Sequence, residues 1–66
     1  TAPDRWTSRL EELISDADPR IRFWAVENTP RFLSTTSAVE FLEASILNEM
    51  DPRVKALMMA VLDEIS

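Results

Sequence analysis

The sequence predicts an all-α protein built from two antiparallel helical hairpins, and three observations support that fold class. The chain has no glycine and no Asn-Gly or Asp-Gly pair, so the common signals of a β-hairpin are missing. Apolar residues recur at helical spacing in four segments, and no segment sustains the alternation typical of a strand. Residues 18–26 and 51–59 both begin Asp-Pro-Arg and continue with an aliphatic and then a basic residue. They start 33 positions apart (51 − 18 = 33), a period typical of stacked helical hairpins.

The first helix is expected to span about residues 3–15. Pro3 suits the first turn, because the amide that proline lacks would have no helical partner there. One apolar stripe at helical spacing consists of Trp6, Leu10, Leu13 and Ile14. This stripe should face the core, and Asp16 and Asp18 end the pattern.

The second helix is expected to begin with Asp18 as its N-cap and Pro19 as its first helical residue. A carboxylate at the N-cap can accept the unpaired amides of the first turn and suits the positive end of the helix dipole. The predicted buried face consists of Ile21, Trp24, Ala25 and Phe32. Pro30 should kink or end the helix near residues 28–29, and Asn28 should satisfy backbone carbonyls that this proline frees.

The third helix is expected to follow a polar loop at residues 34–37 and to run to about Asn48. Ser37 and Glu40 match a capping box, in which each side chain bonds the other residue's amide. The predicted apolar stripe consists of Val39, Leu42, Ile46 and Met50. A turn at residues 49–51 should then lead into the last helix.

The fourth helix should start at Asp51 and Pro52 as the second starts at Asp18 and Pro19. Its apolar face consists of Val54, Leu57, Met58, Val61 and Ile65. The connections into both Asp-Pro helices are short, so each of the two hairpins should be antiparallel.

The doubled phrase resembles the HEAT-repeat family, especially its bacterial HEAT-like members. The matching residues are 18–22 with Ala25 and 51–55 with Ala56 and Ala60. The resemblance covers nearly the whole chain as a single domain of two units, about 1–33 and 34–66. It implies a short right-handed solenoid in which the second and fourth helices line the binding surface.

The same resemblance implies a ladder of ion pairs between neighbouring repeats, here formed by Asp18, Arg22, Asp51 and Lys55. Because the chain begins at Thr1 and both of its ends abut helical patterns, we expect it to be a piece of a longer protein or to be processed at its start. The flanking sequence would then decide whether it belongs to an array of repeats or is attached to another domain.

Composition argues against catalysis. The chain has no cysteine and no histidine, and it lacks a glycine-rich phosphate loop, so we predict no enzyme activity, no metal and no cofactor. No run of about 20 apolar residues would span a membrane, and no signal peptide is recognisable. The lack of cysteine is compatible with a cytoplasmic location, which we expect.

Six residues are candidates for binding a partner: Arg20, Arg22, Phe23, Arg53, Lys55 and Met59. The four basic ones fall in the first turns of the second and fourth helices, where they could hold an anion beside free helix amides. The alternative is that they pair with Asp18 and Asp51 and are solvated. Trp6 and Trp24 lie on apolar stripes and are expected in the core, whereas Phe23 should be at the surface.

Met59 should lie off the main apolar face of its helix, while Met58 should fill the core. Met59 belongs to a predicted apolar flank that also includes Phe41, Leu47 and Leu62. Such a flank is expected where a neighbouring repeat or a second copy would cover it.

We therefore expect a non-enzymatic protein-interaction or scaffold module that binds a protein partner or itself, and no small-molecule substrate. The first alternative is nucleic-acid binding through the N-terminal arginines, which the net charge of −5 disfavours. The second alternative is an accessory domain that helps to assemble a larger enzyme.

Overall fold

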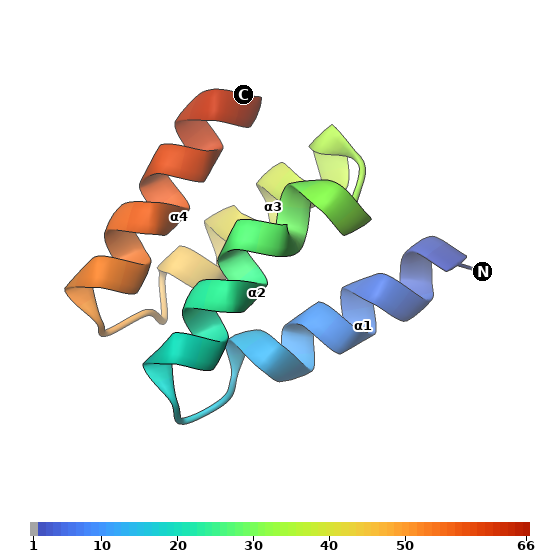
Figure 1. The fold of residues 1–66 in the computed structure, drawn as a ribbon. Helices are drawn as coiled ribbons and strands as arrows, with labels where there is room; N and C mark the ends of the chain where they lie inside the picture. The colour runs from blue at the N-terminus through green and yellow to red at the C-terminus, as the bar shows by residue number, and fades with distance from the viewer. Residues whose placement is uncertain (1) are drawn as a thin grey trace.

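Four α-helices form the computed structural model, which describes the backbone of residues 2–66 and the side chains of residues 5–66 (Figure 1). The helices are α1 (Ala2–Ile14), α2 (Pro19–Phe32), α3 (Thr35–Ile46) and α4 (Pro52–Ile65). No strand occurs among residues 2–66, so the predicted all-α class is confirmed. No described helix has both the length and the apolar character needed to cross a membrane.

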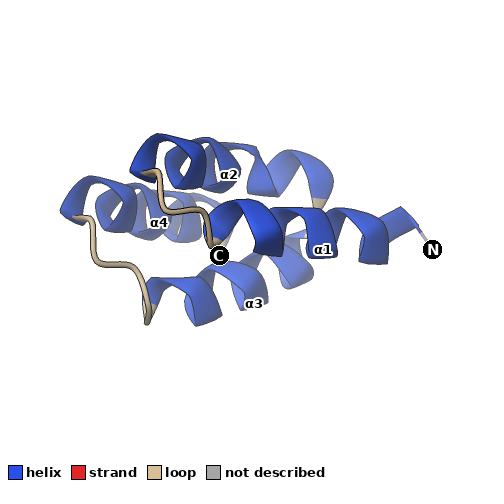
Figure 2. Ribbon diagram, turned by 90° about the horizontal axis from the view of Figure 1, so that it is seen from below, coloured by secondary structure: helices blue, strands red, loops and turns tan. Residues whose placement is uncertain are grey.

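The helices lie in two layers, with α2 and α4 in one and α1 and α3 in the other (Figure 2). Helix α2 is central, because it packs closely against α1 and α4 and more lightly against α3. Helix α4 also packs against α3, whereas α1 has no contact of comparable extent with α3 or α4.

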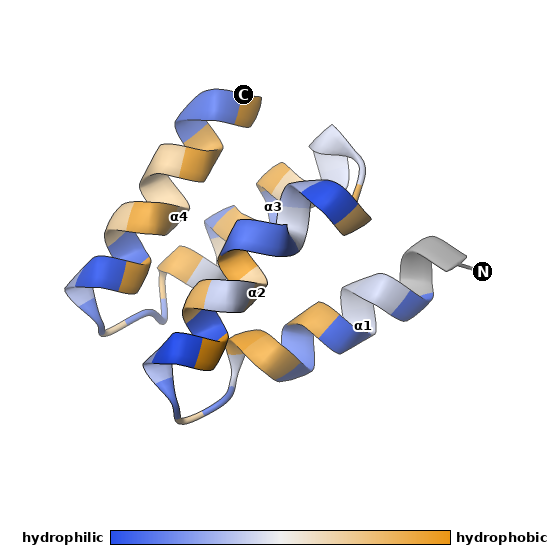
Figure 3. Cartoon of the chain, viewed as in Figure 1, coloured by the Kyte–Doolittle hydropathy of each residue, from blue (hydrophilic) through white to orange (hydrophobic). Residues whose placement is uncertain are grey.

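All four helices or their ends contribute to one core. Its buried apolar members are Leu10, Ala25, Val26, Leu33, Ala38, Phe41, Leu42, Val54, Met58 and Val61. Hydrophobic residues are dense along the middle of α4, as Figure 3 shows. Each large side chain buried in this way stabilises the fold by about 1.5–3 kcal/mol relative to its exposed state.

The two Asp-Pro helix starts are confirmed, and they are nearly identical. The Asp18 Oδ1 atom accepts the amide of Arg20 at 2.9 Å. The Asp51 Oδ1 atom accepts the amides of Arg53 at 2.8 Å and Val54 at 3.3 Å. Both caps have φ −82° with ψ 117° and 121°, so one backbone conformation starts both helices.

The expectation that Pro30 ends or kinks the second helix near residues 28–29 was wrong in its end point, because α2 continues through Pro30 to Phe32. Proline lacks the amide that would bond the carbonyl of Val26, which is a local loss. Tertiary contacts of the last turn offset it, since Leu33 is buried and Phe32 packs against the core. Asn28 does bond a backbone carbonyl, but it is that of Trp24, at 2.9 Å, and not one freed by Pro30.

The third helix begins earlier than expected. The hydroxyl of Ser34 caps α3 by accepting the amide of Ser37 at 3.3 Å, so both the loop at 34–37 and the Ser37–Glu40 capping box were wrong. The extra turn buries Ala38 completely, which favours the earlier start. Because α3 ends at Ile46, before the predicted end at Asn48, the residues that follow lie in a turn.

Several large apolar side chains expected in the core are exposed. Trp6 is 39% exposed and stacks on Phe32, with ring centroids 4.2 Å apart. Trp24 is 47% exposed and Ile21 is 36% exposed on α2, while Met50 in the turn before α4 is 91% exposed. The expectation that both tryptophans are core residues was therefore wrong. The neighbouring helices cover only part of the predicted buried face of α2.

Candidate functional site

A groove of about 430 Å³ lies between the starts of α2 and α4, and we call it the arginine groove. It is lined by Pro19, Arg20, Phe23, Asp51, Arg53 and Val54. The two Asp-Pro turns place these residues, because they start both helices with the same geometry and leave the helix starts side by side (Figure 3). The groove therefore combines an apolar floor with two basic edges.

The two arginines at its edges extend into solvent. The side chain of Arg20 is 90% exposed and that of Arg53 is 87% exposed. Arg20 forms an ion pair with Asp18 at 3.1 Å, and Arg53 approaches Asp51 at 4.0 Å. Each arginine thus pairs with the N-cap of its own helix, which matches the alternative considered for these basic residues.

Hydrogen bonds at these caps lower the pKa values of both N-cap carboxyl groups. The Arg20 side chain and amide hold the pKa of Asp18 below its ordinary value of 3.8. The Arg53 and Val54 amides hold the pKa of Asp51 below the same value, against a smaller opposing effect of burial. Both carboxylates are therefore charged at neutral pH and occupy the helix amides that an external anion would need.

Phe23 lies at the floor of the arginine groove. It is half-buried and packs against the core, so the expectation of a surface aromatic was only partly right. Val54 beside it is buried, with 2% exposure. An apolar side chain of a partner could rest on this floor between the guanidinium groups of Arg20 and Arg53.

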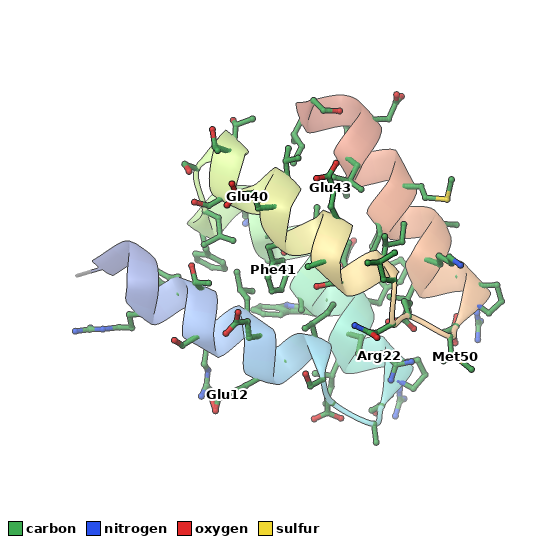
Figure 4. All side chains as sticks on the ribbon, turned by 180° about the vertical axis from the view of Figure 1, so that it is seen from behind. Glu12, Arg22, Glu40, Phe41, Glu43 and Met50 are labelled. Atoms are coloured by element: carbon green, nitrogen blue, oxygen red, sulfur yellow. The ribbon has the colours of Figure 1, made fainter. Side chains whose placement is uncertain are left out.

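Arg22 does not join the predicted ladder with Asp18, Asp51 and Lys55. Its Nε and Nη2 atoms instead donate to the two carboxylate oxygens of Glu49, at 3.0 Å each. Its Nη1 atom donates to the backbone oxygens of Asp16 at 2.8 Å and Ala17 at 3.2 Å. Arg22 thereby ties the loop before α2 to the turn before α4, near Met50 (Figure 4).

Glu49 is the important residue that the sequence reasoning missed. Its side chain is 2% exposed, and its Oε2 atom also accepts the amide of Asp51 at 2.9 Å. Asp16 does the same in the first repeat, where its Oδ1 atom accepts the amide of Asp18 at 2.8 Å. The repeat therefore extends two residues upstream of each Asp-Pro pair, and an acidic residue at both places was the available signal.

The other candidate residues lie on α4, away from the groove. Lys55 is exposed and forms no ion pair with any described residue, while Met59 is 59% exposed, as expected. Of the remaining predicted flank, Leu47 is 84% exposed and Leu62 is half-buried. Phe41 was wrongly included, because it is 8% exposed and belongs to the core near α1 (Figure 4).

A wider cleft of about 820 Å³ runs between α1 and α3. Small and acidic residues line most of it, including Glu11, Ser15, Glu40 and Ala44. The Arg22–Glu49 pair lies at one end of this cleft, where it is occupied by contacts within the chain. Among the described residues, no group of three or more acidic side chains is placed to hold a metal ion.

Comparisons with protein-family models, with curated proteins and with solved structures found no match. The geometry of the chain itself must therefore support any functional proposal. It offers a basic-edged apolar groove across α2 and α4, and separate apolar side chains exposed on α2 and α4.

Proposed function

We propose that this chain is a non-enzymatic protein-interaction module, a pair of stacked HEAT-like helical hairpins that binds partners through the surface of α2 and α4. The 33-residue period and the matching starts of α2 and α4 support the repeat architecture. The two-layer arrangement, in which α2 and α4 lie side by side, is the arrangement that such hairpins adopt (Figure 2).

The arginine groove is the observation that carries the proposal. Its floor of Phe23 and Val54 suits an apolar side chain, and its edges of Arg20 and Arg53 suit carboxylates. The partner is therefore an extended peptide segment in which acidic and aliphatic residues alternate. A carboxylate of the peptide competes with Asp18 and Asp51 for the exposed guanidinium groups, so each contact adds modest affinity.

Nucleic-acid binding is the weaker candidate. Arg22 is engaged by Glu49, and the caps of α2 and α4 place Asp18 beside Arg20 and Asp51 beside Arg53. A phosphate backbone would meet these carboxylates as well as the guanidinium groups, on a chain of net charge −5. A role as an accessory domain of an enzyme is compatible with the same groove, because assembly needs only a binding surface.

The proposal is tested by titrating the isotopically labelled chain with a capped peptide of alternating Asp and Leu, followed by NMR. Binding should shift the amide signals of Phe23 and Val54. Arg20→Gln and Arg53→Gln should each weaken the affinity about two- to fivefold, the effect of losing about 0.5–1 kcal/mol.

Arg31→Gln provides the matched control, because Arg31 is also exposed on α2 but lies in its last turn. Its affinity should equal that of the unchanged chain. Absence of shifts at the groove, or an equal loss in all three variants, would overturn the proposal. Salt-sensitive binding of a labelled oligonucleotide that requires Arg20 and Arg53 would favour the nucleic-acid alternative instead.

A further inference from the structure

Helices α2 and α4 begin with the same Asp-Pro-Arg phrase and the same cap geometry, yet they differ in which positions they bury. Val26 and Thr29 of α2 are fully buried. Met59 and Leu62 stand 33 positions later on α4, and they are 59% exposed and half-buried respectively. One side of α4 therefore leaves exposed, at least in part, the positions whose equivalents on α2 are buried. We call this side, with Lys55, the trailing face.

The opposite side of the two helices shows the reverse difference. Val54 and Val61 of α4 are 2% and 7% exposed. Their equivalents on α2 are Ile21, which is 36% exposed, and Asn28, which is half-buried. Trp24 lies between them and is 47% exposed, so we call Ile21, Trp24 and Asn28 the leading face of α2.

The close contact between α2 and α4 explains both differences, because each helix covers one side of the other. Two sides remain uncovered, the leading face of α2 at one end of the molecule and the trailing face of α4 at the other. We propose that a second copy of this chain docks head to tail, so that the trailing face of α4 in the second copy packs on the leading face of α2 in the first. The new contact would repeat the α2–α4 contact already present within the chain, and this inference rests on the stacked-repeat architecture proposed above.

Charge complementarity supports this occupant. Within the chain, Arg22 of one repeat binds Glu49, the acidic residue two positions before the next Asp-Pro start. The equivalents at the open ends are Lys55, which forms no ion pair within the described part of the chain, and Asp16. One oxygen of Asp16 accepts the Asp18 amide, as Glu49 accepts the Asp51 amide, and the other oxygen has no bonded partner among the described residues. Lys55 of one copy therefore pairs with Asp16 of the next.

The contact joins two different surfaces, so it is heterologous, and stacking does not close after two copies. The expected behaviour is a series of oligomers whose mean size grows with protein concentration. A symmetric dimer would instead join two identical faces, and it would stop at two copies.

Sedimentation equilibrium over a wide concentration range tests this assembly. Lys55→Glu alone and Asp16→Lys alone should each weaken self-association at least fivefold, because like charges then meet at every junction. An equimolar mixture of the two variants should restore self-association, because in a stack where the two variants alternate each junction joins opposite charges. Met59→Asp should weaken association at least tenfold by placing a carboxylate in the apolar contact.

Asp16→Lys removes the acceptor of the Asp18 amide, so circular dichroism must show that the variant is folded. Asp16→Asn keeps an acceptor for this amide and provides a second variant, which should also weaken association. Arg31→Glu is the control, because Arg31 lies on neither face, and it should associate like the unchanged chain. A strict monomer at every concentration, or a dimer that ignores Lys55 and Asp16, overturns the inference. Peptide binding in the arginine groove should survive these changes, so its loss would count against the proposed function instead.

Discussion

Replacing Arg22 with methionine should destabilise the fold more than any other single change to a charged residue described above. The Glu49 side chain is only 2% exposed, and among the described residues it would retain only the Asp51 amide as a hydrogen-bond partner. Removing one member of a buried ion pair costs about 3–5 kcal/mol, because the other charge is left uncompensated. A chain of this length has a total stability on the order of 3–10 kcal/mol, at about 0.05–0.15 kcal/mol per residue. The variant should therefore lose a third or more of its stability.

Urea denaturation followed by circular dichroism measures this loss, at low protein concentration so that self-association does not contribute. Lys55→Met is the matched control, because Lys55 is the equivalent residue of α4 and has no ion-pair partner among the described residues. It should change stability by less than about 0.5 kcal/mol. The double variant Arg22→Met/Glu49→Met should recover at least about 1 kcal/mol relative to Arg22→Met, since no buried charge then remains. Equal losses in Arg22→Met and Lys55→Met would refute the account of this pair.

Three smaller predictions concern the caps and the aromatic stack. Asp51→Ala should cost about 1 kcal/mol in a urea unfolding curve, because two helix amides lose their acceptor, while Asp51→Asn should cost less. The lowered pKa values of Asp18 and Asp51 contribute stability that is fully present above their unfolded value of 3.8 and is lost as the pH falls through the lower folded values. Acid titration should therefore show a shallower loss of stability in the double variant Asp18→Asn/Asp51→Asn, and an unchanged profile would contradict this. Trp6→Leu should remove the stacking on Phe32, worth about 0.5–1.5 kcal/mol, and a thermal melt unaffected by the change would show that the stack adds nothing.

Local chemistry was the part of the fold that the sequence predicted best. An aspartate before a proline specifies a helix start through its own carboxylate and a fixed φ angle, so Asp18 and Asp51 needed no knowledge of the rest of the chain. The continuation past Pro30 depends on the burial of Leu33, which only the folded chain supplies. The start at Ser34 depends in the same way on the burial of Ala38.

The arginine groove was partly predictable. Arg20, Arg53 and Phe23 were candidates because the repeat places them at equivalent helix starts, and the structure brings them together. The role of Arg22 was not predicted, since the ladder expected from the HEAT resemblance pairs it with the wrong acidic residues. Comparing the two repeats two positions further upstream would have found Glu49, which is equivalent to Asp16.

The exposed tryptophan on α2 shows why a repeat in sequence does not give a repeat of environments. Trp24 and Leu57 occupy equivalent positions, but α2 covers the leading side of α4, and no described helix covers that side of α2 to the same extent. Hydrophobic spacing identifies both residues as apolar-face positions without stating how many neighbours exist. The two ends also differ from each other, with Trp24 and Ile21 at one and Met59 at the other. Surfaces that differ in this way complement one another more readily than themselves, which favours head-to-tail stacking over a two-fold dimer.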